Sequence, residues 1–471
     1  MEASQPPNGP IARFLAARPA LAAVGLSAAV FAVGIAVVAI RGVHPEDDGK
    51  TFEQLALNLI EHRRYTWGDG EEWVKKTHIP KEREPLEPCA DYAPLHPVVL
   101  AAAISIGRGN YAVVGAANAL WLAGATLLAM LLAARVSDDA RAPVITGLLA
   151  LATVPLYSGL TNFYREPLYV FLLVGTAYSL VRAFSDRAHL RPTICAGVFW
   201  GLSILCKPIL LIFVPFYVIF RTACRPNGET IPRGLRRALI VVLVCAAVVA
   251  PWVIRNVMQG IGPTVATQGG LNFMSTVGDT GNISTRLYPD SDDTHRLLTE
   301  RERAELSETA INRLIHARKL QRLEADPALA AKILVRNALR LVYFIDSTTG
   351  RVHLTWVIAA PFFALGLWHT VTKRAGQWRC RALVATMIAA FCAGLLVHIA
   401  SPGYRLPIEP LVFVIAACGM VQFDARLSTR ALTPWRRLFW IAYLGCCVAF
   451  YFAYTPAVRS GVSGAVSGWL G

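Results

Sequence analysis

Two adjacent carboxylates, Asp47 and Asp48, follow shortly after the apolar run LAAVGLSAAVFAVGIAVVAI at residues 21–40. A carboxylate at a membrane surface can act as a general base, which removes a proton from an attacking hydroxyl group. Acidic residues are also favoured at the first turn of a helix, because the positive end of the helix dipole attracts them. The pattern alone leaves both interpretations open.

Several other polar residues stand near the ends of apolar runs, where they could act on a ligand at the membrane surface. The cations are Lys207 in CKP, Arg255 in WVIRN and Arg405 in GYRLP. Cations in such places can stabilise a developing negative charge, but they can also anchor a span by reaching toward the interface. Tyr404 and His96 are further candidates for hydrogen bonds to a ligand, and each is also a typical interfacial residue.

The residues after Asp48 predict the element that would carry it. Phe52, Leu55, Ala56 and Leu59 recur at helical spacing in KTFEQLALNLIEH. This spacing is typical of an amphipathic helix that lies along the membrane interface. The sequence therefore predicts that Asp48 lies at the N-terminus of a surface helix.

The remaining candidates for chemistry are excluded by their spacing. The histidines show no HExxH pattern, and the acidic run at 290–293 lacks the distal Glu of a calcium loop. Most of the 10 cysteines lie inside apolar runs, so no disulfide framework is indicated. The net charge of +15 is spread over short segments between apolar blocks, which argues against nucleic acid. We expect neither a metal nor a cofactor.

The composition indicates a protein that crosses the membrane several times. Hydrophobic residues make up 55% of the chain and charged residues 16%, which is too apolar for a soluble protein of this size. We expect about eleven spans, since about 20 apolar residues are needed for each. They lie near residues 18–41, 111–134, 142–160, 166–184, 193–206, 208–221, 237–254, 351–370, 382–400, 406–423 and 438–456.

The basic residues predict the topology. The short run 95–107 is predicted to be an interfacial or re-entrant helix. All the basic clusters then fall on the cytoplasmic side, near residues 13–18, 135–141, 182–191, 221–237, 373–381 and 426–437. Residues 42–110 and 255–350 then lie outside. The second of these predicts surface helices, because Thr299 and Glu302 form a capping-box pattern and Asp326-Pro327 is typical of a helix start.

The ordered series of motifs resembles a known family over nearly the whole chain. The series runs YAPLHPVVLA, NFYREPLYVFLLVGTAY, GVFWGLSILCKPILLIFVPF, PWVIRN, GGLNFM and SPGYRLPIEPLV. It is similar to the GT-C glycosyltransferases, in particular the dolichyl-phosphate-mannose mannosyltransferase and lipid A aminoarabinose transferase superfamily.

This resemblance implies roles for individual residues. The family has an acidic residue four positions before an aromatic in its first outer loop, which selects Asp48 with Phe52 and leaves Asp47 as a neighbour that could assist. A second family acid opens the helix after the third span and corresponds to Glu166, although Asp is more usual in the aminoarabinose transferases and Glu is also common at a helix start. Lys207 and Arg405 match family motifs near the lipid phosphate, and Arg255 is a weaker candidate. Tyr404 and His96 could add hydrogen bonds to the phosphate or the sugar.

The resemblance also implies a fold and an activity. The fold would be an all-α GT-C bundle in three regions: a module at 1–254 that includes the outer loop 42–110, an outer segment at 255–350, and C-terminal spans at 351–471. The activity would be transfer of a sugar from a polyprenyl-phosphate donor to a lipid, glycan or protein acceptor, with inversion at the anomeric carbon. The protein would lie in the cytoplasmic (inner) membrane, with its active site on the extracytoplasmic side. A transporter or flippase of lipid-linked sugars and a non-catalytic scaffold are alternative interpretations.

Overall fold

The structure is a computed structural model of the chain, and it describes most of the residues between 19 and 453. The described range excludes residues 47, 67–87, 187–188, 227, 270–272, 274–296, 300, 303–305, 307, 343–352, 375, 399–401 and 429–432. Two residue groups considered above, Asp47 and the acidic run 290–293, lie outside the described residues.

The described part of the chain is helical, with a single isolated β-bridge between Thr66 and Pro88. In order, the helices are α2 (Pro19–Arg41), α3 (Asp48–His62), α5 (Leu95–Gly107), α6 (Ala112–Val136), α7 (Arg141–Leu151), α8 (Val154–Ser158), η1 (Gly159–Thr161), α9 (Glu166–Ser185), α10 (Arg191–Cys206), η2 (Pro208–Ile212), α11 (Phe213–Ala223), α12 (Ile231–Met258), α16 (Glu308–Ala325), α17 (Pro327–Val342), α18 (Leu354–Thr372), α19 (Trp378–Val397), α20 (Pro402–Arg405), η3 (Leu406–Ile408), α21 (Glu409–Leu427) and α22 (Thr433–Ala453). The prediction of an all-α protein is confirmed.

Seven helices among the described residues are long and apolar enough to cross a membrane, or eight if the bent pair α7 and α8 forms one span. Each of the eleven predicted runs coincides with helical structure, but the count of eleven is not reached. The shortfall has a physical reason at α10 and α11, which have only 16 and 11 residues. Because each residue adds about 1.5 Å, a helix this short does not span a hydrocarbon layer of about 30 Å on its own.

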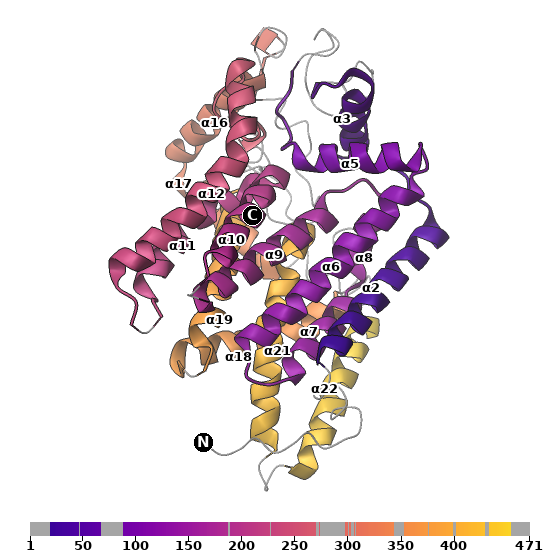
Figure 1. Ribbon diagram of the computed structural model, residues 1–471, viewed down its shortest axis with the longest axis vertical. Coiled ribbons are helices and arrows are strands. Elements are labelled where there is room, and N and C mark those ends of the chain that lie inside the picture. Colours follow the sequence, from indigo (N-terminus) through magenta and orange to yellow (C-terminus); the bar gives the residue numbers. More distant parts are fainter. Residues whose placement is uncertain are drawn as a thin grey trace.

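The elements between α2 and α6 lie together at one end of the bundle. In Figure 1, α5 lies across the ends of α2 and α6 instead of alongside them, and α3 lies above α5. Phe52, Leu55 and Ala56 of α3 are buried, as the helical spacing predicts. The 13 residues of α5 form a helix that is too short to span, as expected for the run 95–107.

Two helix starts between α12 and α18 are formed as local sequence rules predict. The Thr299 backbone N–H donates to the Glu302 carboxylate at 2.8 Å, and the Glu302 N–H donates to the Thr299 hydroxyl at 3.2 Å. These two bonds are the reciprocal pair of a capping box. Asp326 accepts a hydrogen bond from the Leu329 N–H at 3.2 Å at the start of α17. Both predicted caps are confirmed.

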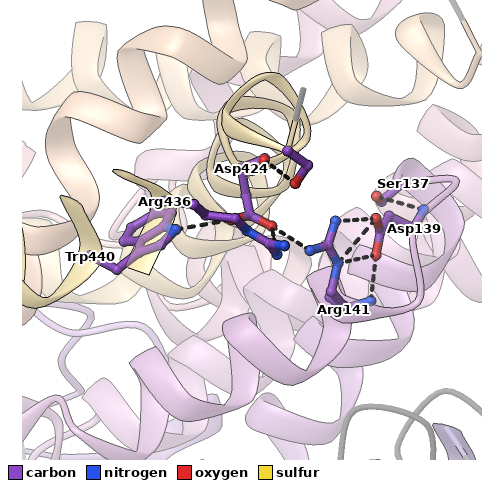
Figure 2. A network of polar contacts seen from close by, with 7 residues as sticks. Ser137, Asp139, Arg141, Asp424, Arg436 and Trp440 are labelled. Atoms are coloured by element: carbon purple, nitrogen blue, oxygen red, sulfur yellow. Dashed lines mark hydrogen bonds and ion pairs between the residues drawn. The ribbon is translucent and has the colours of Figure 1, made fainter. Parts of the chain in front are cut away.

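A network of charges holds α7, α21 and α22 together (Figure 2). The Asp424 carboxylate accepts hydrogen bonds from Arg141 of α7 at 2.6 Å, from Arg436 of α22 at 2.5 and 2.6 Å, and from the Trp440 indole at 3.0 Å. Arg141 also donates to Asp139. Because the Asp424 side chain is only 9% exposed, its charge is stabilised mainly by these donors rather than by water.

Candidate active site

Asp48 is the first residue of α3 and stays exposed, while the next turn of the helix is anchored in the protein. Its Oδ1 accepts a hydrogen bond from the Tyr92 hydroxyl at 3.3 Å. The buried Phe52 ring packs edge-on against Tyr92 and His96, with ring centroids 4.8 Å apart in both pairs. The acid and the aromatic four residues later thus have different tasks, since Phe52 fixes the helix and Asp48 faces outward.

Glu166 and Lys207 form an ion pair at the ends of two neighbouring helices. Glu166 opens α9, and Lys207 caps α10, which ends there because Pro208 disfavours the helical conformation of the preceding residue. The Glu166 Oε1 and the Lys207 Nζ are 3.5 Å apart, and their side chains are 30% and 10% exposed. The Lys207 Nζ also lies 4.8 Å from the centre of the Tyr404 ring.

Arg165 is a member of this site that the sequence interpretation did not single out. Its guanidinium carbon lies 5.5 Å from the ring centres of both Phe52 and Tyr92, a distance typical of cation–π contacts. The only signal in the sequence is its position directly before Glu166 in REPLY. Arg165 and Lys207 together balance the two carboxylates Asp48 and Glu166.

The surroundings of Asp48 alter its protonation. Burial among protein atoms raises the pKa of the Asp48 carboxyl, and the Arg165 charge opposes this rise. Glu166 raises the pKa of Asp48 further, whereas the Tyr92 hydrogen bond and Lys207 lower it. The side chain is nevertheless exposed, so it lies where a ligand can reach it although many protein atoms surround it. A carboxylate with a raised pKa is a stronger base than an ordinary one.

His96 packs against Phe52 beside this site, and its ring is neutral. Its ring is 3% exposed, and its Nε2 lies 2.8 Å from the Phe163 carbonyl oxygen. Because a carbonyl only accepts, Nε2 carries the hydrogen. Burial lowers the pKa of His96 to about 4, so the ring carries no charge at neutral pH. In this position His96 holds the loop before Arg165, and its contact with phosphate or sugar stays a prediction.

Arg255 bonds to the backbone of the segment between α3 and α5. It donates hydrogen bonds to the carbonyl groups of Cys89 and Tyr65 and to the Asn256 side chain, all at 2.8 Å. These contacts tie the end of α12 to the loop before α5. A role of Arg255 in phosphate binding stays a prediction.

Arg405 is engaged in a second buried network. Its side chain donates to the Leu341 carbonyl at 2.6 Å and to the Glu409 carboxylate at 3.0 Å, and it lies 3.9 Å from the centre of the Trp356 ring. Arg405 is 1% exposed, whereas the neighbouring Tyr404 is half-buried and reaches Lys207. In this arrangement Arg405 supports Tyr404, and its direct contact with a phosphate stays a prediction.

The structure therefore brings together Asp48, Glu166, Lys207 and Tyr404 from four separate parts of the sequence. No group of three or more His, Cys, Asp or Glu side chains that could hold a metal occurs among the described residues. The arrangement offers an exposed base beside two cations, which suits the transfer of a group away from a phosphate.

Comparison with protein families identifies the segment that carries most of these residues. Residues 91–254 match the family model described as dolichyl-phosphate-mannose-protein mannosyltransferase. This segment is similar to that family. It includes Tyr92, His96, Arg165, Glu166 and Lys207, and it confirms the resemblance inferred from the motifs over this part of the chain. A search of curated proteins finds no match.

Two solved structures of transferases are similar to this chain, with TM-scores below 0.5. The archaeal oligosaccharyltransferase AglB from Archaeoglobus fulgidus, in complex with an inhibitory peptide and a dolichol-phosphate, is 15% identical with a TM-score of 0.48, over 94% of this chain and 56% of that chain. ArnT from Cupriavidus metallidurans bound to undecaprenyl phosphate is 13% identical with a TM-score of 0.40, over 87% and 78%. The chain thus spans about half the length of the oligosaccharyltransferase, and at these scores the likeness carries no argument about function.

Proposed function

We propose that the protein is an integral-membrane glycosyltransferase that moves a sugar from a polyprenyl-phosphate donor to an acceptor outside the cytoplasm. The observation that carries this proposal is the exposed Asp48 carboxylate close to the ion pair of Glu166 and Lys207. The family of residues 91–254 supports the donor class. The acceptor is a lipid, a glycan or a protein.

The proposed reaction is a single displacement that inverts the anomeric carbon. Asp48 takes the proton of the acceptor hydroxyl while the acceptor oxygen forms a bond to the anomeric carbon. The bond from that carbon to the phosphate oxygen breaks, and the phosphate leaves with its electron pair. Lys207 neutralises the developing phosphate charge, and Tyr404 orients Lys207 from the other side. No nucleotide or cofactor is required.

Glu166 has a different task in this mechanism. It holds Lys207 at 3.5 Å before the donor arrives, so that a buried ammonium group has a counter-charge. The donor phosphate then takes over the role of counter-ion, and Glu166 is left near Asp48, where it favours uptake of the acceptor proton. Asp47 is the assisting neighbour of Asp48 in this proposal.

The proposed location is the cytoplasmic (inner) membrane. There are about eleven spans if the bent pair α7 and α8 counts as one span and α10, α11 and α22 are counted with the seven long helices. The three regions 1–254, 255–350 and 351–471 are the proposed divisions of the chain. The basic clusters predict that α16 faces outward and the start of α12 faces the cytoplasm. In a cysteine-free background, a membrane-impermeant thiol reagent should label Glu324→Cys but not Arg233→Cys in intact cells. The reverse labelling would place the candidate site on the wrong side.

The activity is tested with the purified protein in lipid nanodiscs. Polyprenyl phosphates loaded with mannose or other single sugars serve as donors, and membranes of a deletion strain supply the acceptor. We expect sugar transfer with release of polyprenyl phosphate, and Asp48→Asn should reduce it by about 10²- to 10⁴-fold. Glu61→Gln, an exposed acid on the same helix, is the matched control and should retain activity. Full transfer by a folded Asp48→Asn protein would refute the proposal.

A further inference from the structure

The turn that presents Asp48 is fastened to the loop before α9. The His44 backbone N–H donates to the Thr161 carbonyl at 3.0 Å, and the Glu46 N–H donates to the Asn162 side-chain oxygen at 3.0 Å. The same Asn162 oxygen accepts a second bond, from the Phe163 N–H at 2.8 Å. One amide oxygen thus joins two chain segments that are 116 residues apart.

Gly49 adds a close packing contact to these hydrogen bonds. A Cβ atom built on Gly49 would collide with the Asn162 side-chain oxygen and would lie 3.3 Å from the Phe163 nitrogen. The first turn of α3 therefore packs directly on the Asn162 amide, and only a glycine leaves room for it there. The close approach lies one residue from Asp48.

The loop that holds this turn is itself held from two sides. The Asn118 amide of α6 donates to the Asn162 carbonyl at 3.4 Å, and the His96 ring of α5 bonds the Phe163 carbonyl at 2.8 Å. Asn162 is 6% exposed, so its bonds are protected from water. Three residues later the same loop presents Arg165 and then Glu166, which both act on the Asp48 charge.

We propose that Asn162 is a positioning residue, which sets the place of Asp48 relative to Arg165 and Glu166. This inference rests on the proposed role of Asp48 as the base. An amide or carboxylate oxygen can accept both N–H groups, whereas an apolar side chain of the same size cannot. A misplacement of about 1 Å in a catalytic group can lower a rate by as much as 10²-fold, so loss of this fastening should reduce turnover more than donor binding.

The test compares Asn162→Leu, Asn162→Asp and Gly49→Ala in the transfer assay. Asn337→Leu is the control, because Asn337 is equally buried and donates to a backbone carbonyl, of Leu396, away from Asp48. We expect kcat to fall by roughly 10- to 100-fold in Asn162→Leu and Gly49→Ala, while KM for the donor changes by less than about threefold. The control should keep kcat within about twofold, since a remote buried amide affects folding rather than the reaction.

Asn162→Asp provides a measurement that would not change if Asn162 had a purely structural role. Its carboxylate can accept the same two bonds, so turnover at alkaline pH should remain close to that of the natural protein. Its added negative charge, however, favours the protonated form of Asp48 and should move the acid limb of the pH–rate profile to higher pH. This variant decides the question even if Asn162→Leu fails to fold.

The outcomes separate the two proposals. If Asp48→Asn retains full transfer, the proposed function fails and the role of Asn162 fails with it. If Asp48→Asn is inactive, a normal kcat in a folded Asn162→Leu protein, or an unmoved acid limb in Asn162→Asp, overturns the positioning role alone.

Discussion

Removal of the Tyr92 hydroxyl tests how the site controls Asp48. Tyr92→Phe keeps the ring that packs against Phe52 and lies near Arg165. It removes the hydroxyl group, which donates a hydrogen bond to Asp48 Oδ1 and also bonds to the Gln268 side chain. Burial keeps the pKa of Tyr92 well above its ordinary value, so the hydroxyl remains a donor throughout the pH range of an assay. The substitution therefore removes a single stabilising contact of the charged form of Asp48.

The size and direction of the effect follow from this contact. The bond lowers the pKa of Asp48, so its loss raises that pKa and leaves less of the base ionised at acid pH. The bond is long, at 3.3 Å, so we take the net value of an ordinary hydrogen bond, about 0.5–1.5 kcal/mol. At a pH on the acid limb, this lowers the ionised fraction and the transfer rate by roughly 2- to 10-fold. At alkaline pH the base is ionised in both proteins, and the rates should be nearly equal.

The assay is the initial rate of polyprenyl phosphate release from pH 4.5 to about 9, a range that brackets ordinary and raised carboxyl pKa values. Tyr443→Phe is the control. Tyr443 lies on α22, and its hydroxyl donates to the Ile358 carbonyl of α18 at 3.0 Å. Its profile should match that of the natural protein. An equal loss at every pH, or an acid limb that moves to lower pH, would refute the role assigned to Tyr92 and to the Asp48 charge.

Two further predictions concern the ion pairs. Lys207→Gln should weaken the binding of free polyprenyl phosphate by roughly 10- to 100-fold, the value of a hydrogen bond between charged groups, whereas Glu166→Gln should strengthen it because the competing carboxylate charge is gone. Fluorescence or calorimetric titration measures both, and weaker binding in Glu166→Gln would contradict the counter-ion role. Asp424→Asn should destabilise the protein by about 1.5–3 kcal/mol, the value of a hydrogen bond to a charged group, because it removes the negative charge that binds Arg141 and Arg436 at a 9% exposed carboxylate. It should leave transfer by the folded protein unchanged. Asp186→Asn, a carboxylate that is 29% exposed and contacts two exposed arginines, should cost at most about 1 kcal/mol, and equal melting temperatures for the two variants would contradict the estimate.

Features that depend on neighbours in the chain were predictable from the sequence. The capping box at Thr299 and Glu302 and the cap at Asp326 involve residues three apart, and both formed as the local rule requires. The buried face of α3 also followed from spacing, because helical periodicity decides which side chains share a face. The number of spans did not follow in the same way, since apolar runs near 193–206 and 208–221 form helices that are shorter than a bilayer.

The membership of the site was decided only in part by the sequence. Asp48, Glu166 and Lys207 were selected by their resemblance to family motifs, and the tertiary structure placed them together. Tyr92, Arg165 and Asn162 were not selected, because each acts through contacts with residues that are far away in the chain. Tyr92 bonds Asp48 across 44 residues, and Asn162 bonds Glu46 across 116. A local pattern specifies which residues share a helix face. Only the packing of α3 and α5 against the loop before α9 determines which side chains meet between these elements. Those contacts then decide the protonation of Asp48 and the direction in which its side chain points.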